Sequence, residues 1–292
     1  MKKLNLFASF WLVLSVLLLS TSCNVSAQRV KGVGKSTPTE SNVNINNVVK
    51  IYANSSIDVE AVPSVERKVI VTAQDNIKDL ILIKVVGNAV QVEFKPAINV
   101  STSDVTKVTF YLPEIQELVT NGSGDIHCSR GFSSGADLSV KANGSGDIKV
   151  SDIECAFLRV AIDGSGDIEI KNVKCREIKT SVDGSGDVDV ENFTCEKVTT
   201  IVNGSGDIEY RGNVNEHVVR IEGSGSLEAY DLKTNITQVD VRGSGDSHVW
   251  ATNKLDLNID GSGDIYYKGA PAVDIYKQGS GKAIPRPIKS DK

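Results

Sequence analysis

The sequence contains only three histidines in 292 residues, at His127, His217 and His248. Nucleophilic catalysis by a Ser–His–Asp or Cys–His set needs a histidine within hydrogen-bonding reach of the nucleophile. In the repeat architecture described below, His127 and His248 lie six coils apart, which is about 29 Å. The spacing therefore indicates no such catalytic set, and no motif for a cofactor is present.

Basic residues are not in excess, because 32 Lys and Arg face 37 Asp and Glu, for a net charge of −5 and a pI near 5.4. Proteins that bind nucleic acid through its phosphates carry a basic patch and a basic domain pI. The composition therefore excludes a nucleic-acid partner of this kind.

Long apolar runs are also scarce, and only residues 10–19 form one. Ten residues are too few to span a membrane stably. The run follows Lys2 and Lys3 and precedes Val25-Ser26-Ala27, which is typical of a signal-peptide cleavage site. We therefore expect residues 1–27 to be a signal peptide, and the exported chain to have no membrane-spanning segment.

Cys23 offers an alternative to cleavage after Ala27. The stretch Leu19-Ser20-Thr21-Ser22-Cys23 is a loose lipoprotein pattern. A lipid on Cys23 would tether the protein to a membrane surface. The sequence thus predicts export to the periplasm, the outer membrane surface or the medium, with lipidation left open.

The most prominent feature present is the tetrapeptide Gly-Ser-Gly-Asp, which returns at a nearly fixed spacing. It starts at Gly122, Gly144, Gly164, Gly184, Gly204, Gly243 and Gly261, with variants at Gly223 and Gly279. Self-similarity at a period of about 20 residues is the signature of a solenoid. Alternating apolar residues flank each copy, as in Ile148-Lys149-Val150 and Ile168-Glu169-Ile170, which indicates half-buried strands. We predict an all-β protein, a parallel β-solenoid with one tetrapeptide per coil and a less regular β N-terminal part.

The repeated tetrapeptide has a structural explanation as a corner. Glycine supplies either positive φ or close backbone approach, and Asp can accept hydrogen bonds from nearby N–H groups. The expected structural corners include Gly122, Gly124, Gly144, Gly146, Gly164, Gly166, Gly184, Gly186, Gly204 and Gly206. A column of carboxylates could instead hold calcium, with Asp147, Asp167, Asp187 and Asp207 as the candidate ligands. We favour the structural interpretation and expect no metal.

The chain divides into segments that differ in composition and in strand pattern. After the signal peptide, residues 28–42 are small and polar and predict a linker. Residues 43–120 are rich in strand patterns without the tetrapeptide, and form either a cap or irregular first coils. Residues 121–282 are the regular coils, and residues 283–292, with Pro285 and Pro287, predict a tail.

Three cysteines share one position in the repeat. Cys155, Cys175 and Cys195 each lie eight residues after the repeat Asp, so they should stack on three consecutive coils. Buried cysteine is a small apolar filler, which is the interpretation we favour. Neighbouring coils are also close enough for a strained disulfide, and export would permit one. Three cysteines cannot all pair, and they lack a fourth ligand for a tetrahedral metal site.

Aromatic residues gather on the outward positions of the last coils, where Tyr230 and Trp250 are expected in one column with Tyr266 nearby. Outward aromatic rings suit the flat faces of sugars, by analogy with base stacking. The alternative is that the rings shield the C-terminal end of the core. We take these three residues as the candidate ligand-binding site.

With its signal peptide, its β-rich segment from about Val43 and its Gly-Ser-Gly-Asp-Ile repeats, the chain resembles the family "putative auto-transporter adhesin, head GIN domain" over roughly residues 43–270. The resemblance implies an envelope protein with a β-helical head and an adhesive, non-enzymatic role. We therefore expect a protein that presents a solenoid face to a cell-surface glycan or an envelope protein. The alternatives are a polysaccharide-active β-helix enzyme and a purely structural scaffold. The oligomeric state is not indicated.

Overall fold

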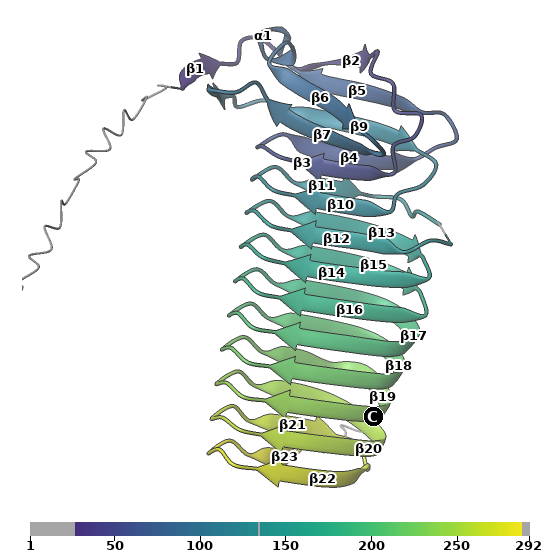
Figure 1. Cartoon of the computed structure of the whole chain (residues 1–292), viewed down its shortest axis with the longest axis vertical. Helices are drawn as coiled ribbons and strands as arrows, with labels where there is room; N and C mark the ends of the chain where they lie inside the picture. The colour runs from purple at the N-terminus through teal and green to yellow at the C-terminus, as the bar shows by residue number, and fades with distance from the viewer. Residues whose placement is uncertain (1–26, 134, 288–292) are drawn as a thin grey trace, which may run out of the picture.

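The computed structural model describes residues 27–133 and 135–287, and these form a long column of stacked β coils (Figure 1). The one helix among them is the single turn α1 (Asp75–Lys78). The expected signal peptide, apart from Ala27, and Cys23 lie outside the described residues. No helix in the described ranges is both long enough and apolar enough to cross a membrane.

The regular part of the column is a parallel β-solenoid, as the repeat predicts. Each strand pairs in parallel with the equivalent strand of the next coil; Ile148, for example, lies opposite Ile168, which lies opposite Val188. The strands are β10 (Glu117–Thr120), β11 (Ile126–Cys128), β12 (Leu138–Ala142), β13 (Ile148–Glu154), β14 (Phe157–Ile162), β15 (Ile168–Lys174), β16 (Glu177–Val182), β17 (Val188–Val202), β18 (Ile208–Ile221), β19 (Leu227–Val241), β20 (Ser247–Ile259), β21 (Ile265–Lys268), β22 (Ala272–Lys277) and β23 (Ala283–Pro285).

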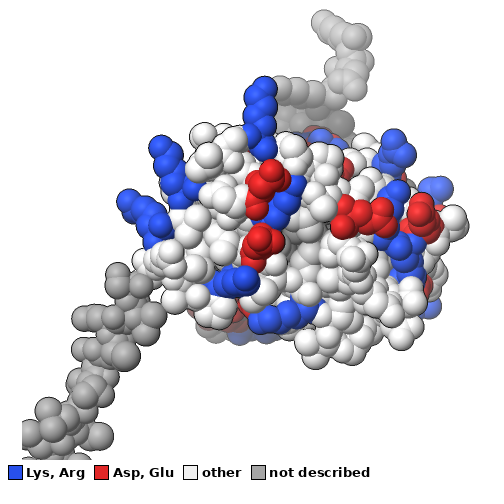
Figure 2. All heavy atoms as spheres, turned by 90° about the horizontal axis from the view of Figure 1, so that it is seen from above, with Lys and Arg blue, Asp and Glu red and all other residues white. Residues whose placement is uncertain are grey.

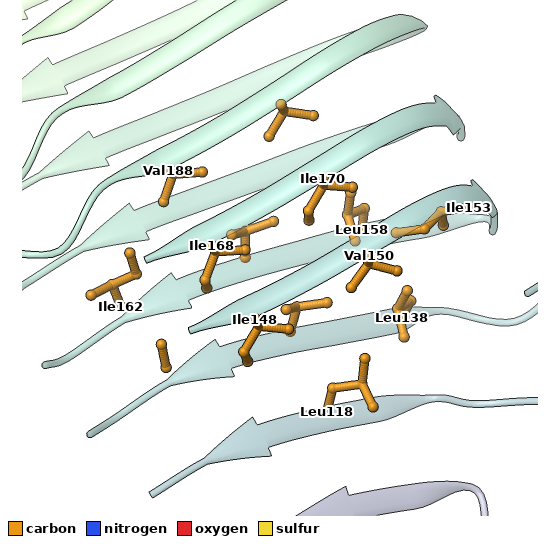
Figure 3. Close-up of a cluster of buried hydrophobic side chains, with 14 of the residues drawn as sticks. Leu118, Leu138, Ile148, Val150, Ile153, Leu158, Ile162, Ile168, Ile170 and Val188 are labelled. Carbon is orange, nitrogen blue, oxygen red and sulfur yellow. The ribbon is translucent and has the colours of Figure 1, made fainter. Parts of the chain in front are cut away.

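The interior of the solenoid is filled by aliphatic side chains from both walls. Every second residue of a strand points inward, so equivalent Ile, Val and Leu residues follow one another along the column (Figure 3). Ile148, Ile168 and Val188 are each at most 1% exposed. Burying such a side chain contributes about 1.5–3 kcal/mol, so the stacking of coils itself supplies the core.

The corner glycines are needed for close approach of neighbouring coils. A Cβ atom added to Gly166 would lie 2.1 Å from the carbonyl oxygen of Gly146 on the preceding coil. The glycines with positive φ in the described residues are Gly34, Gly87 and Gly269, none of which belongs to a corner. Of the two roles that the sequence allows for these glycines, the structure selects the close backbone contact.

The second turn of the early coils has a left-handed residue. Asp152, Asn172 and Asn192 each have φ of 56°, a conformation that Asn and Asp adopt more readily than other side chains. Their side chains also connect the coils, since Asn172 Nδ2 donates to Asp152 Oδ1 at 2.7 Å. This explains the Asn or Asp that precedes an apolar residue at this turn.

The N-terminal part combines irregular coils with a cap. Strands β3 (Lys50–Ala53) and β4 (Asp58–Pro63) pair in parallel with β10 and β11 below, and with β7 (Ala89–Phe94) and β9 (Lys107–Leu112) above. Above these, β5 (Lys68–Ala73) and β6 (Ile81–Val86) run antiparallel to β9 and β7. Charged side chains of both signs are spread over this end of the column (Figure 2). The cap covers the sheet edge that the first coil would otherwise expose.

Two polar segments contain strands where composition predicts none. In residues 28–42, the expected linker, β1 (Gln28–Lys31) pairs with β8 (Ile98–Ser101), and β2 (Thr37–Ser41) pairs with β5. Strand β23 lies within the expected tail and pairs with β21. Strands β1 and β2 are held by backbone hydrogen bonds and keep most of their side chains exposed, so they need no apolar pattern.

Candidate functional site

The repeat Asp residues form a ladder of hydrogen bonds between coils. The Oδ1 atom of each accepts the backbone N–H of the equivalent residue one coil later, at 2.7–2.9 Å from Asp125 to Ser226. The ladder continues at 2.7 Å from Asp246 through Asp264 to Lys282. The carboxylates therefore bind the next coil, whereas the sequence predicts bonds within their own corner.

The candidate calcium ligands Asp147, Asp167, Asp187 and Asp207 all belong to this ladder, and they line a shallow groove of about 410 Å³. Other acidic side chains beside the groove are paired with bases. Arg211 Nη1 lies 3.2 Å from Asp189 Oδ1 and also contacts Glu191. Lys149 Nζ lies 3.4 Å from Glu169 Oε2. Within residues 27–133 and 135–287, no three His, Cys, Asp or Glu side chains are grouped so as to hold a metal ion.

The three histidines occupy unrelated settings, so the structure does not bring them together. His127 lies 4.0 Å from Asp125 on the outer surface. His217 is fully buried, with Nε2 2.9 Å from the Thr200 hydroxyl. His248 belongs to the aromatic group described next.

Outward side chains of three successive coils form an aromatic stack around His248. The imidazole of His248 is parallel to the ring of Tyr266, with centroids 4.7 Å apart, and meets Tyr230 edge-on at 4.9 Å. Backbone register explains the stack, because His248 lies opposite Glu228 on β19 and Tyr266 on β21. Its Nδ1 is 2.8 Å from Glu228 Oε1, close but not aligned as a hydrogen bond, and the contact becomes an ion pair when the imidazole is protonated.

Trp250 joins this group through a lysine, and its expected pairing with Tyr230 is wrong. The register shifts between Ala229 and Lys233, so Trp250 lies opposite Lys233. Lys268 Nζ instead connects the two rings, lying 4.3 Å from the centre of Trp250 and 5.6 Å from that of Tyr230. We call Tyr230, His248, Trp250, Tyr266 and Lys268 the aromatic cluster.

Arg286 covers the far side of the aromatic cluster. Its guanidinium lies 4.8 Å from the centre of the Tyr266 ring. Burial raises the pKa of Tyr230, and Arg286 acts in the opposite direction. Residue 286 falls in the expected tail, so the segment after the last corner contributes to the candidate site.

A hollow of about 520 Å³ adjoins Trp250. Polar side chains line most of it: Asn192, Thr194, Arg211, Asn213, Asp231 and Lys233, with Trp250 as the aromatic wall. The hollow lies where register shifts interrupt the pairing of β17, β18 and β19. It combines hydrogen-bonding groups of both signs with one large apolar face.

The aromatic cluster is not the cover of the C-terminal end of the core. That position is taken by Tyr267, Val273 and Ala283, which pack against the buried residues. Tyr266 and Trp250 alternate with the inward residues Ile265 and Val249 and so point outward. The structure thus favours a surface role for the rings over the shielding alternative.

Sequence reasoning missed His248, Lys268 and Arg286 as members of this group. His248 and Tyr266 are both two residues after a repeat Asp, which is the signal that could have paired them. Arg286 follows the repeats, and no periodicity places it.

A second groove, of about 630 Å³, lies on the wall formed by β18, β19, β20 and β22. Its lining includes Arg220, Gln238, Asp240, Asn258 and Tyr276. Tyr276 is 59% exposed, the most exposed large aromatic residue described. Tyr276 therefore provides a control residue for experiments on the aromatic cluster, because it lies on a different surface.

Comparison with known proteins gives a family and a fold. The family model "Putative auto-transporter adhesin, head GIN domain" matches residues 48–211 and 163–271. The crystal structure of a "Putative lipid binding protein" from Parabacteroides distasonis ATCC 8503 is similar, with 26% identity and a TM-score of 0.65 over 90% of this chain and 100% of that chain.

Two further crystal structures show the same fold. A putative adhesin from Parabacteroides distasonis ATCC 8503 has 24% identity and a TM-score of 0.64, covering 89% of this chain and 100% of its own. A putative adhesin from Parabacteroides merdae ATCC 43184 has 21% identity and a TM-score of 0.63, covering 90% of this chain and 100% of its own. No curated protein matches the sequence.

Proposed function

Because the chain belongs to the family "Putative auto-transporter adhesin, head GIN domain", we propose that it is a non-catalytic, adhesin-like protein of the cell envelope that binds a glycan. The proposed site is the aromatic cluster together with the hollow beside Trp250. The observation that carries the proposal is the position of Trp250, which walls a hollow of about 520 Å³ lined by Asn, Asp, Arg and Lys side chains.

The chemistry of this surface suits a sugar. Hydroxyl groups of a sugar both donate and accept hydrogen bonds, and Asn192, Asn213, Arg211 and Asp231 offer both kinds of partner. The apolar face of a sugar ring packs against an aromatic ring, which Trp250 supplies. Pockets for small ligands commonly combine such an apolar wall with a few polar groups.

The cations over the rings limit how the ligand enters. Lys268 lies 4.3 Å from the centre of Trp250 and 3.8 Å from Asp231, and Arg286 covers Tyr266. A sugar that packs on these faces displaces a flexible lysine or arginine, whose head group can then bind a sugar oxygen. Trp250 can also be approached from the hollow.

The position of the site along the column supports a role in adhesion. The cap lies at the end where the chain emerges from the proposed signal peptide, and the aromatic cluster lies on β19, β20 and β21 near the other end (Figure 1). Coils stack at about 4.8 Å, so the column spans roughly 40 Å. A tether at residue 23 or an attached N-terminus would leave the site near the end of the column that is far from the membrane.

A glycan array with three proteins tests the proposal. Wild-type residues 28–292, the double variant Tyr230→Ala/Trp250→Ala and the control Tyr276→Ala are compared at equal concentration. We expect wild type and the Tyr276 control to bind the same glycans, and the double variant to lose at least about tenfold in affinity, since stacking contacts are worth about 1–3 kcal/mol.

Either of two results would remove the aromatic cluster from consideration. One is unchanged binding by the double variant, and the other is loss of binding only in the Tyr276 control, which would move the site to the second groove. Absence of any glycan signal, with pull-down of an envelope protein instead, would replace a glycan by a protein ligand.

A further inference from the structure

Three cysteines lie next to one another on consecutive coils. Glu154 is opposite Lys174, and Lys174 is opposite Thr194, so Cys155, Cys175 and Cys195 follow in register. The backbone N–H of Cys155 donates to the carbonyl oxygen of Lys174 at 3.0 Å. In-register neighbours of parallel strands are about 4.8 Å apart, which is inside the Cα range of disulfides, about 4.4–6.8 Å.

The backbone register places Cys175 between the other two, since Cys155 lies one coil before it and Cys195 one coil after it. Cys175 therefore has a partner on either side, whereas the two outer thiols are separated by a full coil. Cys128 belongs to β11 at a different position of its coil and is 1% exposed.

Access to solvent distinguishes the three. Cys155 is only 8% exposed, whereas Cys175 and Cys195 are half-buried. Cys195 also borders a surface hollow of about 410 Å³, together with Thr194, Asn213 and Val214. An oxidant in solution can reach Cys175 and Cys195 before it reaches Cys155.

We propose that Cys175 and Cys195 form a disulfide between adjacent coils when the protein meets a disulfide oxidant, such as oxidised glutathione or a disulfide oxidoreductase of an oxidising compartment. The two S–H bonds are lost, one S–S bond forms, and the two protons are taken up by the sulfur atoms of the oxidant. The two electrons reduce the disulfide of the oxidant to two thiols. Cys155 remains as the buried third thiol.

The stacking of the three cysteines also allows thiol–disulfide exchange among them. If Cys155 attacks the sulfur of Cys175, the bond between Cys155 and Cys175 forms, and Cys195 leaves as a thiol that takes the proton lost by Cys155. The hydrogen bond with Cys175 and burial both raise the pKa of the Cys155 thiol, so little thiolate is available for this attack. Exchange to a bond between Cys155 and Cys175 is therefore slow, and a bond between Cys175 and Cys195 persists once it has formed.

The disulfide would support the proposed glycan site from the preceding coils. Thr194 and Asn213 line both the hollow beside Cys195 and the hollow beside Trp250. The bond would tie β17 to the residue that follows β15, close to the position where the register of β17 and β18 shifts. The inference does not depend on the proposed function, because it concerns oxidation of the chain alone.

Peptide mapping of oxidised residues 28–292 tests the inference. The reduced protein is incubated in a glutathione redox buffer, alkylated in denaturant, digested and analysed by mass spectrometry. We expect a peptide that links Cys175 to Cys195, with Cys128 and Cys155 alkylated and a melting midpoint higher than that of the reduced protein. Four alkylated cysteines, or disulfide-linked dimers in place of the internal bond, would overturn it.

Two variants separate the partners. Cys175→Ser should form no internal disulfide, because its remaining cysteines are not neighbours. Cys195→Ser should form the bond between Cys155 and Cys175, but more slowly. An internal bond that appears in Cys175→Ser at the wild-type rate would contradict the proposal. Mapping of the wild type decides the matter even if a variant fails to fold.

Discussion

The backbone N–H of Asp167 donates a hydrogen bond of 2.9 Å to the side-chain oxygen of Asp147, one coil earlier. The same bond recurs along most of the column. It explains why an acidic residue follows the corner glycines so regularly. The glycines let the coils approach, and the Asp side chain satisfies the N–H group that the approach brings toward it.

Replacing one Asp of the ladder should weaken the column locally. Asp187→Ala removes the acceptor that the N–H of Asp207 uses at 2.7 Å. We expect a loss of about 1 kcal/mol in the free energy of unfolding, the usual net contribution of one hydrogen bond, because the Asp187 side chain is exposed. Asp187→Asn keeps an acceptor oxygen and should lose less. Urea unfolding measures the stability of both variants. The control is Asp163→Ala, because Asp163 lies at the preceding corner but does not belong to the ladder. Equal effects at Asp163 and Asp187 would refute the ladder's role.

Replacing a corner glycine should be far more damaging. The Cβ atom of Gly186→Ala would lie 2.1 Å from the carbonyl oxygen of Gly166, and a backbone atom cannot move aside cheaply. We expect a loss above about 3 kcal/mol, among the larger effects of point mutations. Gly135→Ala is the matched control, because nothing lies within 4 Å of its added Cβ atom. Thermal melting of both variants checks the prediction, which fails if the two midpoints agree.

His217 should make the protein sensitive to acid. Its side chain is fully buried, and burial lowers its pKa from 6.5 to about 3. Between these values the unfolded chain binds a proton that the folded chain does not, so stability falls as the pH decreases from about 6.5 toward 3. The slope from this one group is at most about 1.4 kcal/mol per pH unit.

The variant His217→Leu isolates that contribution. Leucine suits the site, because the equivalent residue two coils later is Leu255. We expect this variant to lose less stability than wild type between pH 7 and pH 4 in urea titrations. Parallel pH profiles for the two proteins would show that His217 does not control the acid response.

Lys277 should protect the open end of the column. It lies opposite Ile259 on the core-facing side of β22, in a column that holds Val241 and Ile221 on earlier coils. No further strand pairs with β22 in the described residues, and an inward charge on an edge strand discourages pairing with another chain. Lys277→Val should therefore produce dimers or larger species in light scattering after size exclusion. Lys282→Val removes the same charge at a corner, and its oligomeric state should match that of wild type. If both variants associate alike, the cause is the lost charge alone and not the position of Lys277.

Most of the fold could be predicted from the sequence because the repeat fixes it. Residues such as Ile148, Ile168 and Val188 recur at one position, and only stacked strands bury them all. Strands β1 and β2 could not be predicted in the same way. Their pairing uses backbone groups, which every residue carries, so Gln28 and Thr37 give no sign of it.

The sequence predicts three of the five residues of the aromatic cluster as neighbours, but not their geometry. Tyr230, Trp250 and Tyr266 lie in one cluster, yet Trp250 is opposite Lys233 because the register shifts within β19 and β20. The corner tetrapeptides are unequally spaced over this part of the printed sequence, which permits such a shift without revealing where it falls. Arg286 lies beyond the repeats, and only the three-dimensional path of the chain brings it over Tyr266.

Thermal melting with and without calcium tests most directly whether the corner Asp residues serve only the structure, which leaves ligand binding to the aromatic cluster. Residues 28–292 are melted in calcium and in chelator at the same ionic strength. A ligand that binds only the folded state raises the midpoint. The Asp carboxylates already accept hydrogen bonds from the next coil, so we predict superimposable curves. A midpoint several degrees higher in calcium would contradict this division and make the Asp column a cation site.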